Sequence, residues 1–121
     1  MFTIIDPTSV EAHAGLMKAV FRLRKRVFAD KLGWDVPVTG DEEFDEYDAM
    51  GANYLVWTSP DRSTLYGALR LMPTDGPTLL HDVFWATHGG SPALCAPDIW
   101  EGTRMCLDET AIARDMPGCS P

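Results

Sequence analysis

Two strands joined by a tight turn are predicted by the stretch NYLVWTSPDRSTLYGALRL, residues 53–71. Residues 53–58 and 64–71 are rich in aromatic and branched apolar side chains, which favour strands, and residues 59–63 have the Ser-Pro-Asp pattern of a turn. We therefore expect an antiparallel hairpin. Alternate side chains of the second strand share a face: Leu65, Gly67, Leu69 and Leu71 on one side, Tyr66, Ala68 and Arg70 on the other.

Upstream of the hairpin, helical periodicity predicts one long helix over about residues 9–29. The residues Thr8 to Glu11 have the pattern of a capping box that would open this helix, and Leu32-Gly33-Trp34 would end it. Arg24 projects from the middle of the apolar stripe. A guanidinium in that position needs carboxylate partners, because an unpaired buried charge is very costly.

The remaining segments give a coarser picture. Residues 35–52 are acidic and irregular, and a loop of this length inside a compact domain is uncommon and often functional. We expect a short helix at 79–88, a loop at 92–97, a third strand at 99–107 and the start of another helix at 108–113. These elements would leave one face of the sheet thinly covered, so the chain looks stopped part-way through a fold.

Composition narrows the classes of function. The chain has 121 residues, enough for one domain, and its net charge of −8 argues against non-specific nucleic-acid binding. We expect a cytoplasmic protein, because the sequence has neither a long apolar run nor a signal-peptide pattern. The spacing of Cys95, Cys106 and Cys119 favours thiols over disulfides, and Cys106 is expected to be buried filler in a strand.

A metal site is not expected from the sequence. The residues His81, Asp82 and His88 lack the spacing of a zinc-binding helix. The acidic loop does not match a calcium-binding loop, because Glu46 occupies the position where the turn glycine is required.

Seven charged residues stand out at ordered spacing: Arg24, Glu43, Asp45, Asp48, Arg70, Glu101 and Arg104. Such a set could form one network that binds a zwitterionic ligand, because guanidinium groups bind a carboxylate and carboxylates hold an ammonium or sulfonium. The alternative is ordinary salt bridging on solvated faces, which is the commoner fate of charged clusters. The positions of Arg24 and Arg70 on apolar elements favour the network.

Five segments carry a further pattern in their order and spacing: Arg24–Phe28, Leu32–Val36, Glu43–Asp48, Gly67–Pro77 and Trp100–Arg104. Together with Phe84 they resemble the acyl-homoserine-lactone (autoinducer) synthase family, over nearly the whole stretch from Arg24 to Arg104. The resemblance implies an α/β fold similar to GCN5-type N-acetyltransferases, a sheet with flanking helices that stops here before it is complete. Residues 1–121 would then be a single partial domain, the amino-terminal half that binds S-adenosylmethionine.

The resemblance also implies an acyltransferase with two substrates, S-adenosylmethionine and an acyl thioester on acyl carrier protein or coenzyme A. The amine of S-adenosylmethionine attacks the thioester, and the methionine carboxylate then displaces methylthioadenosine and closes the lactone. The product is a quorum-sensing signal. No metal, separate cofactor, nucleic acid or membrane is implied.

Catalytic roles are carried over to Glu43, Asp45, Glu101 and Arg104. An ammonium is not a nucleophile, and Glu43 and Asp45 are the candidate bases that remove its proton, directly or through water. Arg104 is the expected partner of the methionine carboxylate. In a regular strand Glu101 and Arg104 point to opposite faces, so either a bulge at Gly102 brings them together or one of them is structural.

Substrate-binding roles are carried over to seven residues: Arg24, Phe28, Trp34, Asp48, Arg70, Phe84 and Thr103. The rings of Phe28 and Trp34 could pack on the sulfonium by cation–π attraction. The side chains of Arg24 and Arg70 are expected to brace the acidic residues. Thr103 stands where many family members have serine, and either hydroxyl can donate a hydrogen bond.

Two alternatives stay open. The chain could be an inactive remnant or an interaction module, because family members are considerably longer and the absent region should complete the sheet and the acyl-chain pocket. It could also be a GCN5-like acyltransferase with another amine acceptor, although no glycine-rich pyrophosphate-binding turn is present. An acidic carrier protein would need a basic patch, for which Arg22, Lys25 and Arg26 are the candidates.

Overall fold

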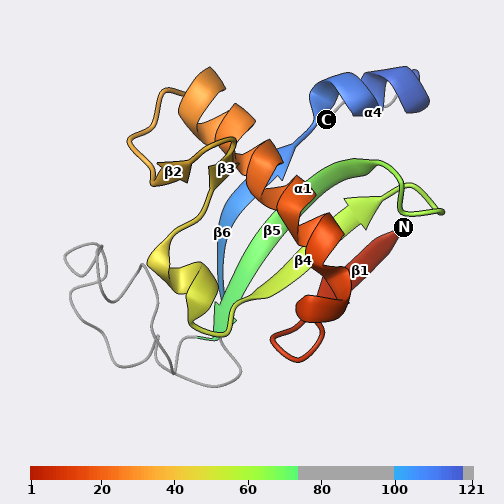
Figure 1. Ribbon diagram of the computed structural model, residues 1–121. Coiled ribbons are helices and arrows are strands. Elements are labelled where there is room, and N and C mark those ends of the chain that lie inside the picture. Colours follow the sequence, from red (N-terminus) through yellow and green to blue (C-terminus); the bar gives the residue numbers. More distant parts are fainter. Residues whose placement is uncertain (74–99, 119–121) are drawn as a thin grey trace.

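The computed structural model describes residues 1–73 and 100–118. Four strands form one antiparallel sheet in the order β1-β4-β5-β6, and a long helix crosses one of its faces (Figure 1). This arrangement confirms the predicted α/β class, a sheet with flanking helices. The elements are β1 (Phe2–Ile5), η1 (Glu11–His13), α1 (Ala14–Arg24), η2 (Lys25–Lys31), β2 (Val38–Thr39), β3 (Glu42–Glu43), η3 (Glu46–Ala49), β4 (Asn53–Thr58), β5 (Leu65–Pro73), β6 (Trp100–Leu107) and α4 (Glu109–Asp115).

The long helix is made of η1, α1 and η2, which follow one another from Glu11 to Lys31, close to the predicted span of 9–29. Its buried apolar side chains belong to the main core, which includes residues of β4 and β5. Arg24 is only 1% exposed, in agreement with its predicted place on the apolar stripe. The chain leaves the helix at Gly33, whose φ of 67° is a conformation that glycine adopts without strain.

The start of the helix differs from the prediction. The Thr8–Glu11 capping box does not form, since the first helical turn has no side-chain cap. Instead the carboxylate of Asp6 accepts hydrogen bonds from the backbone amides of Thr8 at 2.9 Å and Ser9 at 3.0 Å. An ionised carboxylate is a stronger acceptor than a hydroxyl, so Asp6 organises this turn.

Strands β4 and β5 form the predicted hairpin, in which Tyr54 lies opposite Arg70. The β4 bounds match the prediction, and β5 begins one residue later and runs two residues further. Ala68 and Arg70 are buried on the side of the sheet covered by α1. Leu69 and Leu71 alternate with them on the other face and are only partly buried, as the predicted alternation requires.

Tyr66 departs from the predicted alternation. The pairing of β4 with β5 shifts between Trp57 and Thr58, where Thr58 lies opposite Leu65 instead of Tyr66. As a result, Tyr66 packs with Ala111 and Ile112 of α4 in a second, smaller core. A register slip of one residue moves a side chain to the other face of a sheet, which explains the difference.

Two groups of short elements were not predicted. Strand β1 adds an edge to the sheet by pairing Phe2 with Trp57 and Ile5 with Tyr54. The stretch 35–52, predicted as irregular, contains the two-residue strands β2 and β3 and the turn η3. Elements of two to four residues are too short to leave a periodic pattern in the sequence.

The carboxy-terminal elements agree with the prediction where they are described. Strand β6 covers residues 100–107 of the predicted 99–107, and α4 begins at Glu109 within one residue of the predicted start. The predicted helix at 79–88 and the loop at 92–97 lie outside the described residues. No described helix has the length and apolar character needed to cross a membrane.

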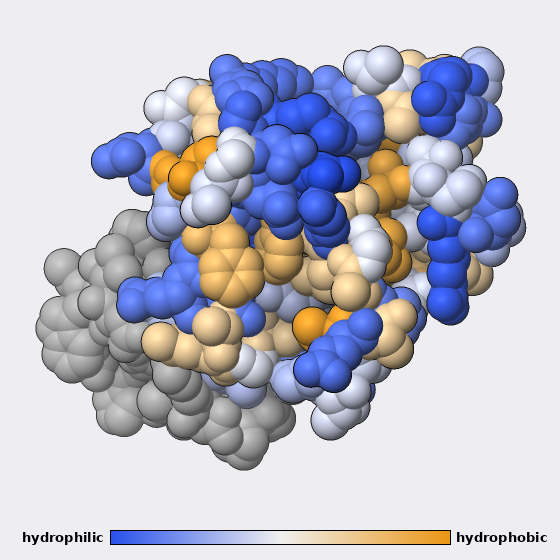
Figure 2. Space-filling view, viewed as in Figure 1, coloured by the Kyte–Doolittle hydropathy of each residue, from blue (hydrophilic) through white to orange (hydrophobic). Residues whose placement is uncertain are grey.

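The two faces of the sheet differ in how far they are covered and in how polar their surfaces are. The α1 side presents a mainly hydrophilic surface, with apolar side chains gathered in smaller groups (Figure 2). On the opposite face a shallow apolar hollow of about 130 Å³ is bordered by residues that include Phe2, Trp57 and Met105. Phe2 and Met105 are 67% and 66% exposed. Within the described part of the chain this face is thinly covered, as predicted.

Candidate functional site

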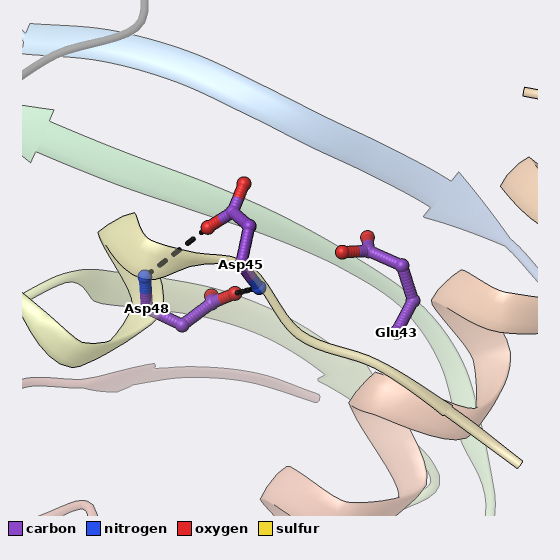
Figure 3. Close-up of side chains that lie close together, drawn as sticks. All are labelled: Glu43, Asp45 and Asp48. Atoms are coloured by element: carbon purple, nitrogen blue, oxygen red, sulfur yellow. Dashed lines mark hydrogen bonds between the residues drawn. The ribbon is translucent and has the colours of Figure 1, made fainter. Parts of the chain in front are cut away.

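Six of the seven predicted charged residues meet on the α1 side of the sheet. They come from five places in the chain: Arg24 from α1, Glu43 from β3, Asp45 and Asp48 at the turn η3, Arg70 from β5 and Arg104 from β6. One carboxylate oxygen from each of Glu43, Asp45 and Asp48 can be chosen so that all three lie within 4.8 Å of one another. Figure 3 shows these carboxylates gathered between the helix and the strands. The predicted network is therefore formed.

Arg24 joins two of the carboxylates. Its Nε and Nη2 atoms donate to Glu43 at 3.0 and 3.1 Å, and its Nη1 and Nη2 atoms donate to Asp48 at 2.7 and 2.9 Å. The side chains of Glu43 and Asp48 have no exposed area. Desolvating these charges is costly, and the two bidentate, charge-assisted contacts offset that cost because each carboxylate receives two hydrogen bonds from Arg24.

Asp45 and Asp48 are positioned by the backbone of η3. The Asp45 side chain accepts hydrogen bonds from the amides of Tyr47 and Asp48, and the Asp48 side chain accepts one from the amide of Asp45 (Figure 3). This is a reciprocal capping box, which satisfies amides at the start of the turn. The pattern Asp45-Glu-Tyr-Asp48 was a usable signal that the sequence analysis missed.

The other two arginines share Asp45. Arg70 Nη1 lies 2.5 Å from Asp45 Oδ1, and Arg104 Nη2 lies 3.2 Å from Asp45 Oδ2. Arg104 also donates through Nε to Glu43 at 2.9 Å. In this way Asp45 has one guanidinium on each carboxylate oxygen. Its side chain keeps 10% exposure and that of Arg104 keeps 13%, whereas the Glu43 side chain is fully enclosed.

The network changes the ionisation of its members. Burial opposes the charged form of Asp48, but the hydrogen bonds and charge of Arg24 outweigh it and lower the Asp48 pKa to about 2. Burial likewise opposes the charge of Arg24, yet Asp48 and Glu43 raise its pKa above the usual range. Tyr54, which the sequence analysis did not select, donates to Asp48 at 2.7 Å, and burial together with that carboxylate raises the Tyr54 pKa.

A bulge in β6 brings consecutive side chains to the site. Ala68 pairs with Cys106 and Arg70 pairs with Thr103, so one residue of β5 faces two residues of β6, Arg104 and Met105. Arg104 has a φ of 56°, the left-handed conformation typical of such a bulge. Of the two alternatives left by the sequence, a bulge is found in β6, but it lies at Arg104 and not at Gly102.

The bulge decides which β6 side chains share a face. Thr103 lies opposite Arg70 and accepts a hydrogen bond from its Nε at 3.0 Å. Glu101 lies opposite Met72, which is buried on the same side as Arg70. Residues directly opposite in an antiparallel pair have their side chains on one face, so Glu101, Thr103 and Arg104 all serve the α1 side.

Two aromatic rings stand beside the charged network. Phe28 and Trp34 stack with ring centroids 5.0 Å apart and an angle of 19° between the planes. The guanidinium of Arg104 lies 5.8 Å from the Phe28 ring centroid. Trp34 is 52% exposed although Phe28 is buried, so the pair offers an open aromatic surface next to the ion pairs. Phe84, the remaining predicted binding residue, lies outside the described residues.

The three carboxylates are an unsuitable cage for a metal ion. Each of them is already contacted by at least one guanidinium of Arg24, Arg70 or Arg104. A cation in the same place would meet three positive charges at hydrogen-bonding range, so the donor set fits a network of arginines and not a metal. Cys106 is buried and burial raises its pKa to about 11, which agrees with its predicted role as filler.

Comparisons with known proteins agree with this geometry. The family model for autoinducer synthase matches residues 8–120. An acyl-homoserine-lactone synthase of Rhizobium etli is 39% identical over 108 residues, which cover 88% of this chain and 50% of the relative. One from Pseudomonas aeruginosa is 38% identical over 120 residues, covering 97% of this chain and 56% of the relative. The chain thus spans about half the length of the curated relatives it matches.

Solved structures show the same fold. The crystal structure of the synthase LasI superposes with a TM-score of 0.75 at 31% identity, over 88% of this chain and 52% of LasI. The CoA-dependent synthase BjaI with SAM and isopentyl-CoA gives a TM-score of 0.76 at 27% identity, over 95% of this chain and 53% of BjaI. The expected sheet of the GCN5-type acetyltransferase class is therefore confirmed. The sequence match, the fold and the formed network together show that this chain belongs to the autoinducer synthase family.

Proposed function

We propose that this chain is the S-adenosylmethionine-binding half of an acyl-homoserine-lactone synthase, and that residues 1–121 form one partial domain of it. The observation that carries the proposal is the juxtaposition of the buried arginine–carboxylate network with the stacked rings of Phe28 and Trp34. A zwitterion that also bears a sulfonium needs arginines for its carboxylate, carboxylates for its ammonium and aromatic rings for its sulfonium, all in one place.

The proposed pose follows from which groups keep some exposure. Phe28 and Trp34 pack against the sulfonium. Asp45, at the partly exposed edge of the network, receives the ammonium. Arg104 uses the edge of its guanidinium that is not occupied by Glu43 and Asp45 to bind the methionine carboxylate. Arg24 and Asp48 lie deeper and hold the other groups in position.

The proposed reaction has two steps. A base, Glu43 or Asp45 acting directly or through water, removes a proton from the ammonium, and the free amine attacks the thioester carbonyl. A C–N bond forms, the C–S bond of the thioester breaks and the thiol leaves with a proton. A carboxylate oxygen then attacks the carbon next to the sulfonium, which closes the lactone and releases neutral methylthioadenosine. Glu101, on the same face, is the further candidate for proton transfer or for bracing.

The acyl donor is proposed to be an acyl thioester of coenzyme A or of acyl carrier protein, in a cytoplasmic reaction. BjaI, a similar structure, was solved with SAM and isopentyl-CoA. The basic patch considered for a carrier protein is partly neutralised, because Arg22, Lys25 and Arg26 pair with Asp41, Asp30 and Asp108. This lowers the free positive charge available to an acidic carrier, so both donors should be assayed side by side.

Calorimetric titration of the purified chain with S-adenosylmethionine tests the proposal. Specific binding that is lost in Asp45→Asn supports it, with circular dichroism showing that both proteins are folded. A folded chain that binds neither S-adenosylmethionine nor methylthioadenosine contradicts it. Mass spectrometry of a reaction with acyl-CoA or acyl carrier protein then separates an active enzyme from an inactive remnant, and a panel of other amines tests for a different acceptor.

A further inference from the structure

Arg70 has an unused donor in a buried place. It is 1% exposed, and its Nη2 is the buried side-chain nitrogen that has no hydrogen-bond partner in the described part of the chain. Leaving a buried donor unsatisfied is costly, and more so when the group is charged. Arg24 and Arg104, by contrast, both use Nη2 to bind carboxylates. The unused donor therefore calls for an acceptor other than the described protein groups.

The position of Nη2 follows from the contacts of the rest of the guanidinium. Nε and Nη2 lie on one edge of this group, as the two-point contacts of Arg24 with Glu43 and of Arg114 with Asp115 illustrate. In Arg70 the Nε on this edge donates to Thr103 Oγ1 at 3.0 Å, whereas Nη1 on the other edge donates to Asp45. Nη2 thus points to the side where Thr103 lies.

Thr103 supplies a second donor in the same place. Its hydroxyl oxygen accepts from Arg70, and no acceptor for its own hydrogen is found in the described part of the chain. Unlike Arg70, Thr103 is partly exposed, so this edge of the guanidinium borders an accessible surface. The guanidinium carbon of Arg70 also lies over the ring of Tyr47, 5.7 Å from the ring centroid.

We propose that Arg70 Nη2 and the Thr103 hydroxyl together bind one oxygen of a substrate carboxylate. Two donors, one of them charged, suit an anionic oxygen better than a neutral one. The nearby protein carboxylates do not fill the place, because Asp45 and Asp48 approach Arg70 at Nη1. The inference rests on the proposed function, in which the carboxylate is that of the methionine moiety, and it adds a contact to the one proposed for Arg104.

The test compares S-adenosylmethionine with decarboxylated S-adenosylmethionine, which keeps the sulfonium and the ammonium but lacks the carboxylate. Calorimetry on the wild-type chain should show tighter binding of the carboxylated ligand. Thr103→Val, which replaces the hydroxyl by a methyl group, should weaken binding of S-adenosylmethionine by about ten-fold and leave the decarboxylated ligand unchanged. Thr103→Ser keeps the hydroxyl and should behave as the wild type.

Two results overturn the inference while leaving the proposed function in place. One is that the wild-type chain binds both ligands equally well. The other is that Thr103→Val weakens both ligands by the same factor, which is the mark of a merely structural role. A folded chain that binds neither ligand contradicts the proposed function itself.

A second measurement is made on ligand binding by the wild-type chain, with one variant used only for signal assignment, and does not depend on the folding of Thr103→Val. The guanidinium ¹⁵N–¹H signals of Arg70, identified by their loss in Arg70→Lys, should shift when S-adenosylmethionine is added and stay in place with the decarboxylated ligand. Signals that respond equally to both ligands contradict the inference.

Discussion

Asp45 and Asp48 each accept a hydrogen bond from the backbone amide of the other. Asp48 Oδ2 lies 2.9 Å from the amide nitrogen of Asp45, and Asp45 Oδ1 lies 3.3 Å from that of Asp48. Both carboxylates are thereby oriented by a single local turn, and three arginines from distant elements then contact them. Local capping and long-range ion pairing support the same geometry, which is how a buried charged group can be held in one arrangement.

The pKa of Asp48 predicts a loss of stability in acid. It is lowered from 3.8 to about 2, so Asp48 contributes stability that is complete above the unfolded value and disappears as the pH falls toward 2. We expect this carboxyl to contribute on the order of 2 kcal/mol to the free energy of unfolding. Urea unfolding of the wild type and of Asp48→Asn at a series of pH values measures it. Parallel pH dependences in the two proteins would contradict the prediction.

Arg24→Met should destabilise the fold strongly. The change removes the four hydrogen bonds that Arg24 donates to Glu43 and Asp48, so the arginine contacts that these buried carboxylates keep are those with Arg104 and Arg70. Breaking a buried pair costs about 3–5 kcal/mol. The matched control is Arg22→Met on the same helix, whose pair with Asp41 has side-chain exposures of 44% and 64%. It should change the free energy of unfolding by less than about 1 kcal/mol. Equal effects in chemical denaturation would rule out the structural role assigned to Arg24.

Gly67→Ala should also destabilise the protein. A Cβ at this position would lie 2.7 Å from Leu107 Cδ2 and 3.0 Å from the backbone oxygen of Cys106. The Leu107 side chain must turn away and the backbone at Cys106 must move slightly, at a cost of about 1–3 kcal/mol. Gly102→Ala is the control on the neighbouring strand, because its nearest atom would be 3.5 Å away, an ordinary contact. In thermal unfolding, the melting temperature of Gly67→Ala should be well below that of Gly102→Ala. The reverse order contradicts this account.

The bulge at Arg104 predicts an inverted preference between glycine and alanine. Both Arg104→Gly and Arg104→Ala lose the ion pairs, but a φ of 56° strains alanine and not glycine, so the glycine variant should be more stable by about 1 kcal/mol. At Met105, which is not among the described residues with positive φ, the alanine variant should be the more stable. Urea unfolding of the four variants measures which variant at each position has the larger free energy of unfolding. If the alanine variant is the more stable at both positions, the bulge does not form in solution.

Discrimination against a neutral sulfur tests the aromatic pair. If Phe28 and Trp34 hold the sulfonium, the chain should bind S-adenosylmethionine more tightly than S-adenosylhomocysteine, whose sulfur is uncharged. Cation–π attraction is worth about 0.5–2 kcal/mol, which corresponds to a two- to thirty-fold preference. Trp34→Leu keeps an apolar side chain and should reduce this preference, as measured by calorimetry. A preference unchanged in Trp34→Leu places the sulfonium elsewhere.

Much of the fold was predictable because its longer elements carry a period. The β4–β5 hairpin and the long helix each have enough residues for the apolar pattern to appear, and Arg24 and Arg70 were recognised as buried from their place in it. Strand β1 and the two-residue strands were missed, because nothing in so short a segment distinguishes a strand from a loop. These strands form because neighbouring strands in the folded protein pair with them: β1 pairs with β4, and β2 pairs with β3.

For the charged network, the sequence indicated the member residues but not the contacts between them. The order of charged residues indicated a network, yet the sequence did not tell which arginine meets which carboxylate, since those distances depend on how α1, η3 and β6 pack together. The bulge was expected at a glycine, but it lies at Arg104, where the ion pairs with Glu43 and Asp45 offset the strain of the backbone.

The extra residue in β6 also sets the smallest unit that could be transplanted to another scaffold. On a strand of uniform alternation, the sequence Glu101-Gly-Thr-Arg104 would send Thr103 and Arg104 to opposite sides. Only together with β5, where a single Leu69 faces two residues, do these side chains turn the same way. A designer who copies this arrangement must therefore copy the mismatch between two neighbouring strands, since the geometry depends on a pair of segments more than thirty residues apart in the chain.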